Sequence, residues 1–335
     1  MTTVLLVGAG AVGSRAARQL VDTPGLTRLL VAGRGRDRLQ RIARVLGRVA
    51  ESVALTPGDP IPAGVDAVAT ALPPEPDVAV ARAAVAARVP FASAGDDDGA
   101  IAALLALDDA ARAAGVTLAT GCGLAPGLAD VLVRHAGGVL ETVDEVHVAR
   151  AGVAGPASLA SVRRARRERP AEWREGAWHR ERRGGAELVW FPDPIGPREC
   201  EPVAAGTALL VASIPGLERA TTRFDEPPAR RVGTALGRRP PEDSWGAARV
   251  EVWGSRGRAR ASVVYGAIDR TAVAAGTMLA VTALGLAGAG PAPARPTVYE
   301  HGAHGLAGLV DPPPFLGELA RRGVKAAVFE GAAVA

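Results

Sequence analysis

Lysine is almost absent from this 335-residue chain, because Lys325 is the only lysine among its 39 basic residues. A Schiff base between a lysine and a substrate could therefore form only at Lys325. The excess of arginine, like that of alanine, reads as a compositional bias, and the formal net charge is only +4. That charge is too small to indicate a nucleic-acid partner.

Cysteine and long apolar runs are also scarce. Cys122 and Cys200 are the only cysteines; they form no metal-ligand spacing and no disulfide framework, so we expect no metal site. No uninterrupted apolar run reaches the ~20 residues that span a bilayer. The longest candidate, residues 271–290, is interrupted by glycine, which favours a buried helix over a membrane segment. With no signal-peptide pattern before the first apolar run, we expect a cytoplasmic protein.

What the first half does contain is a regular alternation of apolar runs and helical patterns with short connections. The length suits two domains, and such alternation is typical of an α/β fold with a doubly wound parallel sheet. We expect a dinucleotide-binding domain over 1–142, an α+β substrate and dimerisation domain with a mostly open sheet over 143–305, and a C-terminal segment, 306–335, that packs back on the first domain. The expected strands of the first half lie within 3–10, 27–34, 65–74, 90–95 and 116–123.

Three glycines follow the first apolar run in the order Gly-x-Gly-x-x-Gly. Gly8 would allow a tight turn, Gly10 would let the backbone approach a pyrophosphate, and Gly13 would let the first helix pack closely on the strand. The pyrophosphate would then lie on backbone N–H groups at the positive end of that helix, with Ala11 and Val12 beside it. The motif predicts a Rossmann-type dinucleotide site; a glycine-rich turn without a ligand is the alternative.

The end of the second expected strand lacks the acidic residue that binds the ribose 2′-hydroxyl of NAD. Ala32 and Gly33 occupy that position, and Arg34 and Arg36 follow. Without a carboxylate to repel it, a 2′-phosphate could bind to an arginine in a bidentate manner. NADP(H) is therefore favoured over NAD(H); the alternative is a solvated Arg34 and an NAD that binds without its usual anchor.

The residues after two later strands are expected at the same edge of the sheet, because ligands of open parallel sheets bind at the carboxyl ends of the strands. Ala71, Leu72 and Pro73 follow one strand, and Gly95 follows another; all four are predicted to line the cofactor. Asp96 and Asp97 come next. One of them could stabilise a substrate cation or relay a proton, or they could simply cap the helix that starts near Gly99.

The stretch GVTLATGCGLAPGLADVLVRHA, 115–136, resembles the saccharopine dehydrogenase-like (saccharopine reductase-type) NAD(P)-binding proteins, in which a strand ends in a Gly-x-x-Pro-Gly turn before the next helix. LVAGR at 30–34, the segment 250–290 and the segment 308–331 resemble other parts of the same family. Residues 300–314, with His301 and His304, depart from its usual closing pattern. The resemblance implies two domains, a nicotinamide cofactor and a cleft between the domains.

Two side chains on expected strands of the second half could donate a proton to a substrate. His147 lies in an alternating run typical of a half-exposed strand, and Tyr265 is one of only two tyrosines. We predict Tyr265 as a catalytic acid and His147 as a substrate contact; a core position is the alternative for each. Cys122 is better explained as a small packing residue than as a nucleophile.

Residues 161–185 interleave arginine with tryptophan. Such a pattern can bind single-stranded nucleic acid, but a solvated helix and turn with partly self-paired charges explains it better. A third possibility is a border of the substrate cleft that holds a carboxylate-bearing or planar substrate. The residues assigned to it are Arg163, Arg164, Trp173 and Trp178.

Together the motif and the resemblance predict an NADP-dependent oxidoreductase. The cofactor would supply the hydride chemistry and the protein the orientation and a proton donor. Resemblance to saccharopine reductases implies that the reacting group is a C=N bond, with an imine reduced to an amine or the reverse. Specialised metabolism is one setting for such a reaction. Reduction of a C=C bond and a redox-silent dinucleotide-binding protein are the alternatives. We expect a small-molecule substrate, a homodimer, and neither a nucleic-acid nor a membrane partner.

Overall fold

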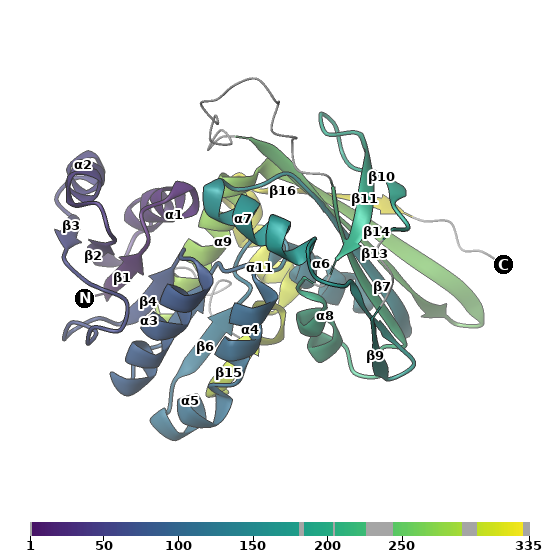
Figure 1. Cartoon of the computed structure of the whole chain (residues 1–335), viewed down its shortest axis with the longest axis horizontal. Coiled ribbons are helices and arrows are strands. Elements are labelled where there is room, and N and C mark those ends of the chain that lie inside the picture. The colour runs from purple at the N-terminus through teal and green to yellow at the C-terminus, as the bar shows by residue number, and fades with distance from the viewer. Residues whose placement is uncertain (1, 181–183, 204, 226–243, 290–299, 331–335) are drawn as a thin grey trace. The chain divides into compact units, whose positions relative to one another are not determined.

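The computed structural model describes residues 2–180, 184–203, 205–225, 244–289 and 300–330 (Figure 1). It divides into two compact units, each described here by itself. The first contains residues 1–123 and 273–322, and the second contains residues 124–272 and 323–335.

The first unit is built on a parallel sheet whose described strands follow the order β15-β6-β5-β4-β1-β2-β3. Residues 4–7 of β1 are buried on both faces, as the continuous apolar run predicts for a strand covered by helices on each side. The order reverses at β1, with β2 on one side and β4 on the other, so the expected doubly wound α/β fold is confirmed. The strands are β1 (Thr2–Val7), β2 (Leu26–Ala32), β3 (Ala50–Val53), β4 (Ala67–Thr70), β5 (Phe91–Ser93), β6 (Thr117–Thr120) and β15 (Gly302–Gly305).

Helices cover this sheet, and Figure 1 shows α3, α4 and α5 side by side over one face. In α3 the buried residues recur at positions 77, 80, 81 and 84, the i, i+3, i+4, i+7 stripe of a helix that packs on a sheet. The helices of this unit are α1 (Ala11–Val21), α2 (Arg36–Leu46), α3 (Pro74–Ala86), α4 (Asp98–Leu105), α5 (Asp108–Ala114), α9 (Thr271–Leu286), α10 (Leu306–Leu309) and α11 (Pro312–Arg321).

The return of residues 273–322 to the first unit differs from the three consecutive segments expected from the sequence. The α9 helix is the reason, because it is apolar on all sides and buried. A Cβ added at Gly276 would lie 2.7 Å from the backbone nitrogen of Ala16, so α9 packs directly against α1. At the end of α11, Arg322 donates to Thr23 Oγ1 at 2.9 Å. None of the described helices combines the length and apolar character needed to cross a bilayer.

The second unit is built on a mixed sheet with the order β10-β11-β12-β7-β13-β14-β16, to which the hairpin β8–β9 adds at β12. Only β12 and β7 run parallel; the other described neighbours are antiparallel. The expected α+β domain with an open sheet is therefore confirmed. Its elements are α6 (Leu128–Gly137), β7 (Thr142–Ala151), α7 (Pro156–Ala165), β8 (Ala171–Arg174), β9 (Ala177–Arg180), β10 (Glu187–Trp190), β11 (Pro197–Val203), α8 (Thr207–Ser213), β12 (Arg219–Asp225), β13 (Trp245–Arg256), β14 (Ala259–Arg270) and β16 (Lys325–Glu330).

Candidate functional site

The glycine turn between β1 and α1 has the geometry that its spacing predicts. Gly8 has a φ of +106°, and a Cβ there would lie 2.4 Å from the carbonyl oxygen of Ala71. A Cβ at Gly13 would lie 1.7 Å from the carbonyl oxygen of Gly8. Both positions therefore require glycine because backbone atoms touch their Cα atoms.

Gly10 is different, because nothing lies within 4 Å of the place where its Cβ would be. It is the N-cap residue of α1, has no side-chain cap, and the first turn of the helix contains no acidic residue. The first N–H groups of α1 therefore have no side-chain cap, and the positive end of the helix dipole lies beside a position with space for an added group. This is the cradle that a pyrophosphate fills in a dinucleotide site.

The end of β2 adjoins this turn. Gly8 N donates to Ala32 O at 2.8 Å, and a Cβ at Gly33 would lie 3.7 Å from Ala9 N. Arg34 and Arg36 follow; both are exposed. Within the described residues neither has a hydrogen bond or an ion pair, so both guanidinium groups are available to an anion.

The segment after β4 closes the other side of the turn. Ala71 N donates to Val7 O at 3.0 Å, and the Leu72 side chain lies 3.2 Å from the Cβ that Gly8 lacks. Pro73 is the N-cap residue of α3. The predicted cofactor residues that follow β1, β2 and β4 are thus brought to one edge of the sheet.

At the ends of β4 and β5 lies a buried carboxylate that the sequence analysis did not single out. Asp77 is 1% exposed. Its Oδ1 accepts a hydrogen bond from Thr70 Oγ1 at 2.5 Å and its Oδ2 one from Ser93 Oγ at 2.5 Å. Gly95 N donates to Ser93 Oγ at 2.9 Å, and a Cβ at Gly95 would lie 3.0 Å from Asp77 Oδ2.

The electrostatics of Asp77 set it apart from an ordinary surface acid. Burial raises its pKa to about 6, although the hydrogen bonds from Ser93 and Thr70 oppose the shift. Removing a carboxylate from water costs several kcal/mol, and each hydroxyl bond to a charged group offsets only about 1.5–3 kcal/mol. The signal was present in the sequence, because position 77 falls on the buried stripe of α3 where an apolar residue is expected.

Asp96 and Asp97 are half-buried in the loop between β5 and α4. Asp97 is the N-cap residue of α4 and its Oδ1 accepts a hydrogen bond from Ala100 N at 3.1 Å. Of the two roles weighed for these carboxylates, capping therefore accounts for Asp97. Asp96 remains the candidate for contact with a substrate cation.

In the second unit, His147 and Tyr265 lie on β7 and β14, as expected. His147 Nδ1 is 2.8 Å from Thr221 Oγ1 and its Nε2 is 3.4 Å from Glu145 Oε2; burial lowers the pKa of His147. Tyr265 is 5% exposed, its ring lies 5.6 Å from that of His135, and burial raises its pKa. The two predicted donors therefore have separate sets of neighbours.

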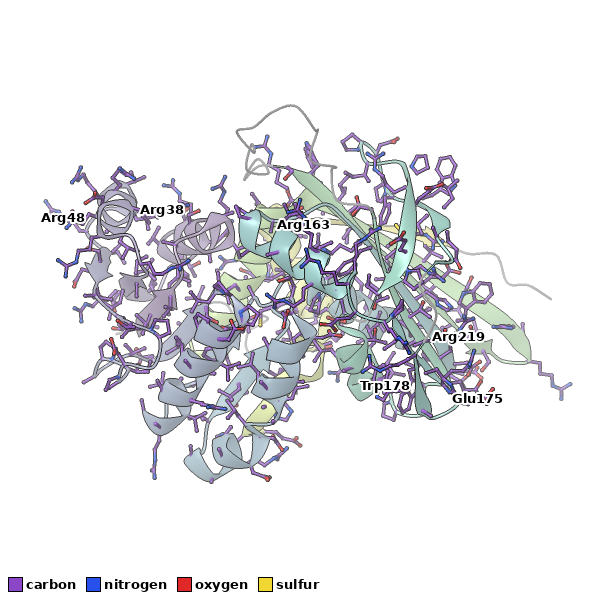
Figure 2. The ribbon with its side chains drawn as sticks, in the orientation of Figure 1. Arg38, Arg48, Arg163, Glu175, Trp178 and Arg219 are labelled. Carbon is purple, nitrogen blue, oxygen red and sulfur yellow. The ribbon has the colours of Figure 1, made fainter. Side chains whose placement is uncertain are left out.

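The four residues assigned to an arginine and tryptophan border lie on a helix and on a separate hairpin. Arg163 and Arg164 are exposed on α7, whereas the rings of Trp173 and Trp178 pack edge to face at 5.4 Å in the β8–β9 hairpin. Figure 2 shows Arg163 and Trp178 well apart. Trp173 Nε1 donates to Leu217 O at 2.7 Å. The segment is a helix followed by a hairpin rather than the expected helix and turn, and residues 181–183 lie outside the described residues.

A hollow of about 650 Å³ in the second unit has Glu172, Arg180, Thr221 and Arg223 among its lining residues. None of the predicted catalytic residues lines it. No cluster of three potential metal ligands occurs within the described ranges. The thiol of Cys122 is fully buried, which raises its pKa to about 12 and fits packing better than nucleophilic attack.

Two further buried ionisable groups of the second unit were missed by the sequence analysis. Arg150 is 3% exposed; it donates to Ala125 O at 2.8 Å and lies 4.5 Å above the Phe224 ring. Asp130 accepts a hydrogen bond from Gly127 N at 2.5 Å, and burial raises its pKa to about 7. Both hold the turn that precedes α6.

Comparisons with known proteins agree with this geometry. Residues 4–119 match the family model described as the saccharopine dehydrogenase NADP binding domain, which confirms the expected resemblance. No curated protein matches the chain by sequence.

Solved structures share the fold at low identity. The apo saccharopine dehydrogenase (L-Glu forming) from Saccharomyces cerevisiae aligns with a TM-score of 0.72 and 13% identity over 98% of this chain and 100% of that one. A probable dehydrogenase from Thermotoga maritima aligns with a TM-score of 0.50 and 13% identity over 97% and 98% of the two chains.

Proposed function

We propose, on the premise that residues 4–119 are a saccharopine dehydrogenase-type NADP-binding domain, that this chain transfers a hydride between NADP(H) and the C=N bond of a small molecule. The family match and the fold indicate a dinucleotide-dependent oxidoreductase. The preference for NADP over NAD and the imine substrate go beyond the family match and are our proposal.

The observation that supports the cofactor most directly is the contrast among the three glycines. Gly8 and Gly13 are closed by backbone atoms, while the Cβ direction of Gly10 is open. Space is thus kept at the one position where a pyrophosphate would touch the backbone. The nicotinamide supplies a hydride donor or acceptor when the dinucleotide is bound.

The preference for NADP is supported by Arg34 and Arg36. Both are exposed at the end of β2, where the acidic residue of an NAD site is missing. A 2′-phosphate placed there would gain charge-assisted hydrogen bonds and meet no carboxylate from the strand.

The imine assignment is supported by the fold shared with the yeast saccharopine dehydrogenase (L-Glu forming) and by the position of Asp96. In the reducing direction, the imine carbon would accept a hydride supplied by bound NADPH and the nitrogen would accept a proton, which would leave the amine and NADP⁺ as products. Asp96 lies at the carboxyl edge of the sheet, where a carboxylate would stabilise the iminium form of the substrate.

Cofactor binding tests the site without a known substrate. We expect Gly10→Ala to weaken NADPH binding at least about tenfold, because its methyl group would occupy the pyrophosphate position. Gly317→Ala is the matched control: Gly317 is a helical glycine of α11 with nothing within 4 Å of its added Cβ. Fluorescence titration with NADPH measures both. Equal affinities in the two variants would contradict the assignment of the glycine turn.

Cofactor choice is tested by Arg34→Ala. Loss of a charge-assisted bond to the 2′-phosphate should weaken NADPH binding by about 1.5–3 kcal/mol and leave NADH nearly unchanged. Arg48→Ala is the control, since Arg48 is an exposed arginine beyond the other end of α2 (Figure 2). An equal loss for both cofactors would show that Arg34 does not recognise the phosphate.

Turnover separates the remaining alternatives. NADPH oxidation would be followed by its absorbance with imines formed from amino acids and 2-oxo acids, and with enones as the comparison. Oxidation by imines alone is the expected result. Oxidation by enones alone would support C=C reduction, and tight NADPH binding without oxidation by either class would support a redox-silent role.

A further inference from the structure

The Asp77 cluster is a set of three side chains, Thr70, Asp77 and Ser93, that joins the ends of two strands to one helix. Thr70 is the last residue of β4 and Ser93 the last residue of β5, and the two are paired in the sheet. Both are fully buried, and both hydroxyls donate to the one carboxylate of Asp77 from α3. Within the described residues this carboxylate has no ion-pair partner.

The direction of the hydrogen bonds shows what the cluster holds. Because the Ser93 proton is donated to Asp77, the Ser93 oxygen is free to accept from Gly95 N. The chain after β5 is therefore anchored through a backbone amide, and a Cβ at Gly95 would lie only 3.0 Å from Asp77 Oδ2, so a side chain there would have to push the carboxylate aside. Asp96 directly follows this anchored glycine.

Thr70 has a different part in the cluster. Its hydroxyl is 2.5 Å from Asp77 Oδ1 and also 3.3 Å from Ala92 O, but it does not bond to Gly95. It orients the carboxylate, whereas Ser93 transmits that orientation to the loop. The two hydroxyls can therefore be separated by experiment.

The cluster lies on the side of the sheet away from the two arginines. The β4 strand pairs with β1 on the side opposite β2, and Val7 pairs with Thr70. In a doubly wound sheet the two nucleotide halves lie on either side of the point where the strand order reverses. If Arg34 and Arg36 after β2 take the phosphorylated adenosine half, the β4 and β5 ends face the nicotinamide half.

We infer that Asp77 is a positioning residue for the nicotinamide half of the cofactor: through Ser93 it fixes the Gly95 amide and the loop that carries Asp96. This inference rests on the proposed function. A buried carboxylate without a cationic partner is unfavourable on the face of a helix that packs in the core. In this chain the Asp77 carboxylate maintains the position of the loop after β5.

The test compares NADPH with 2′-phospho-ADP-ribose, which lacks the nicotinamide. Asp77→Asn and Ser93→Ala should each weaken NADPH binding about tenfold or more and change the affinity for the truncated ligand less than about twofold. Thr70→Val, which removes only the orienting hydroxyl, should have a smaller effect on NADPH than Ser93→Ala. Affinities would be measured by titration calorimetry on the full chain.

A matched variant separates positioning from general loss of stability. Glu318→Gln removes the charge of a buried carboxylate in α11 of the same unit, where Glu318 pairs with Arg321 and Arg322. It should leave both affinities unchanged even if it lowers the melting temperature. Ser93→Ala should in addition speed amide hydrogen exchange in the peptide containing Gly95, in the absence of any ligand.

The outcomes distinguish this inference from the function on which it rests. A wild-type chain that binds neither ligand would overturn the proposed function. If the wild-type chain binds both ligands, two results would overturn the positioning role alone. In one, Ser93→Ala and Asp77→Asn bind NADPH as tightly as wild type; in the other, they lose affinity equally for both ligands. If Asp77→Asn does not fold, Ser93→Ala decides the question.

Discussion

The carboxyl edge of the first sheet and the charged strands of the second sheet differ in the kind of polar groups that they contain. At the first edge the polar groups are backbone amides, two hydroxyls and one buried carboxylate, held by contacts of 2.5–3.0 Å. On the second sheet they are long charged side chains. Glu145 alone pairs with His147, Arg219 and Arg260.

These charged side chains form a chain of ion pairs across neighbouring strands, with Arg219 also bound to Glu172 at 2.5 Å. Several partners are substantially exposed, among them Arg260 at 57% and Arg219 at 42% of the side chain. Solvent screens such pairs, so each contributes little to stability. The comparison teaches that positions packed against backbone atoms, such as Gly8 and Gly13, have no room for an added atom, whereas flexible charged side chains can adjust.

The largest expected effect is that of Gly13→Ala. Alanine would favour the helix by about 1 kcal/mol, but its Cβ would lie 1.7 Å from Gly8 O. Since both partners are backbone, the turn must move, and we expect a loss of about 3 kcal/mol or more in the free energy of unfolding. Urea denaturation of Gly13→Ala and of the control Gly317→Ala measures it. A stability equal to that of the control would show that the glycine turn is not rigid.

A glycine of the second unit, Gly254, tests whether close packing against backbone atoms is confined to the glycine turn of the first unit. A Cβ at Gly254 would lie 1.8 Å from Thr142 O, where β13 crosses an irregularity in its pairing with β7. We expect Gly254→Ala to lower the free energy of unfolding by an amount similar to that of Gly13→Ala. Only Gly13→Ala should also abolish NADPH binding in the molecules that remain folded.

An intermediate effect is expected at Asp130, the buried carboxyl of the second unit. Its pKa is raised from 3.8 to about 7 in the folded state, so the folded protein binds more protons than the unfolded chain between these values. Stability therefore falls as pH rises from about 4 to about 7, by at most about 1.4 kcal/mol per pH unit. Asp77 adds a loss of the same sign between 3.8 and about 6.

Asp130→Asn keeps an oxygen for Gly127 N and removes the titration. Relative to wild type it should gain stability progressively from about pH 4 to about pH 7 and level off above that, as measured by urea midpoints across the range. Parallel curves for the two proteins would mean that Asp130 does not titrate with a raised pKa.

The smallest effect is expected at Arg260, which pairs with Glu145 and lies 5.1 Å above the ring of Trp253. Because this arginine is more than half exposed, Arg260→Ala should cost less than about 1 kcal/mol. The difference from wild type should shrink further in high salt. A loss near 2 kcal/mol would remove the contrast between the two regions.

The parts of the site that depend on one local stretch of chain were predictable. The spacing of Gly8, Gly10 and Gly13 is visible in the sequence, and the contact that excludes a side chain at Gly13 is a local one with Gly8 O. The contact that excludes a side chain at Gly8 comes from Ala71, after β4. The exposed Arg34 is similarly placed by the strand that precedes it. The local pattern at Asp97 allowed either a helix cap or a cleft residue. The hydrogen bond from Ala100 N shows that Asp97 is a cap.

Other parts were hidden because their partners are distant in sequence. Asp77 meets Ser93 across two elements, and Arg150 reaches Ala125 from the next strand. The buried stripe of α3 could have drawn attention to Asp77, but its hydroxyl partners could not be identified from spacing. The return of α9 to the first unit depends on Gly276 fitting against α1, a match of two surfaces that no periodicity encodes.

The sequence by itself determined most of the alternation of strands and helices within residues 1–123, the position of the glycine turn and the basic end of β2, because these follow from local hydrophobic pattern, glycine spacing and charge. It did not predict the strands β3 and β15 or the division between α4 and α5. Tertiary structure decided which side chains surround Asp77, how the charges of the second sheet pair, and where residues 273–322 pack. Those outcomes depend on burial and on contacts between distant segments, and only the folded chain brings these together.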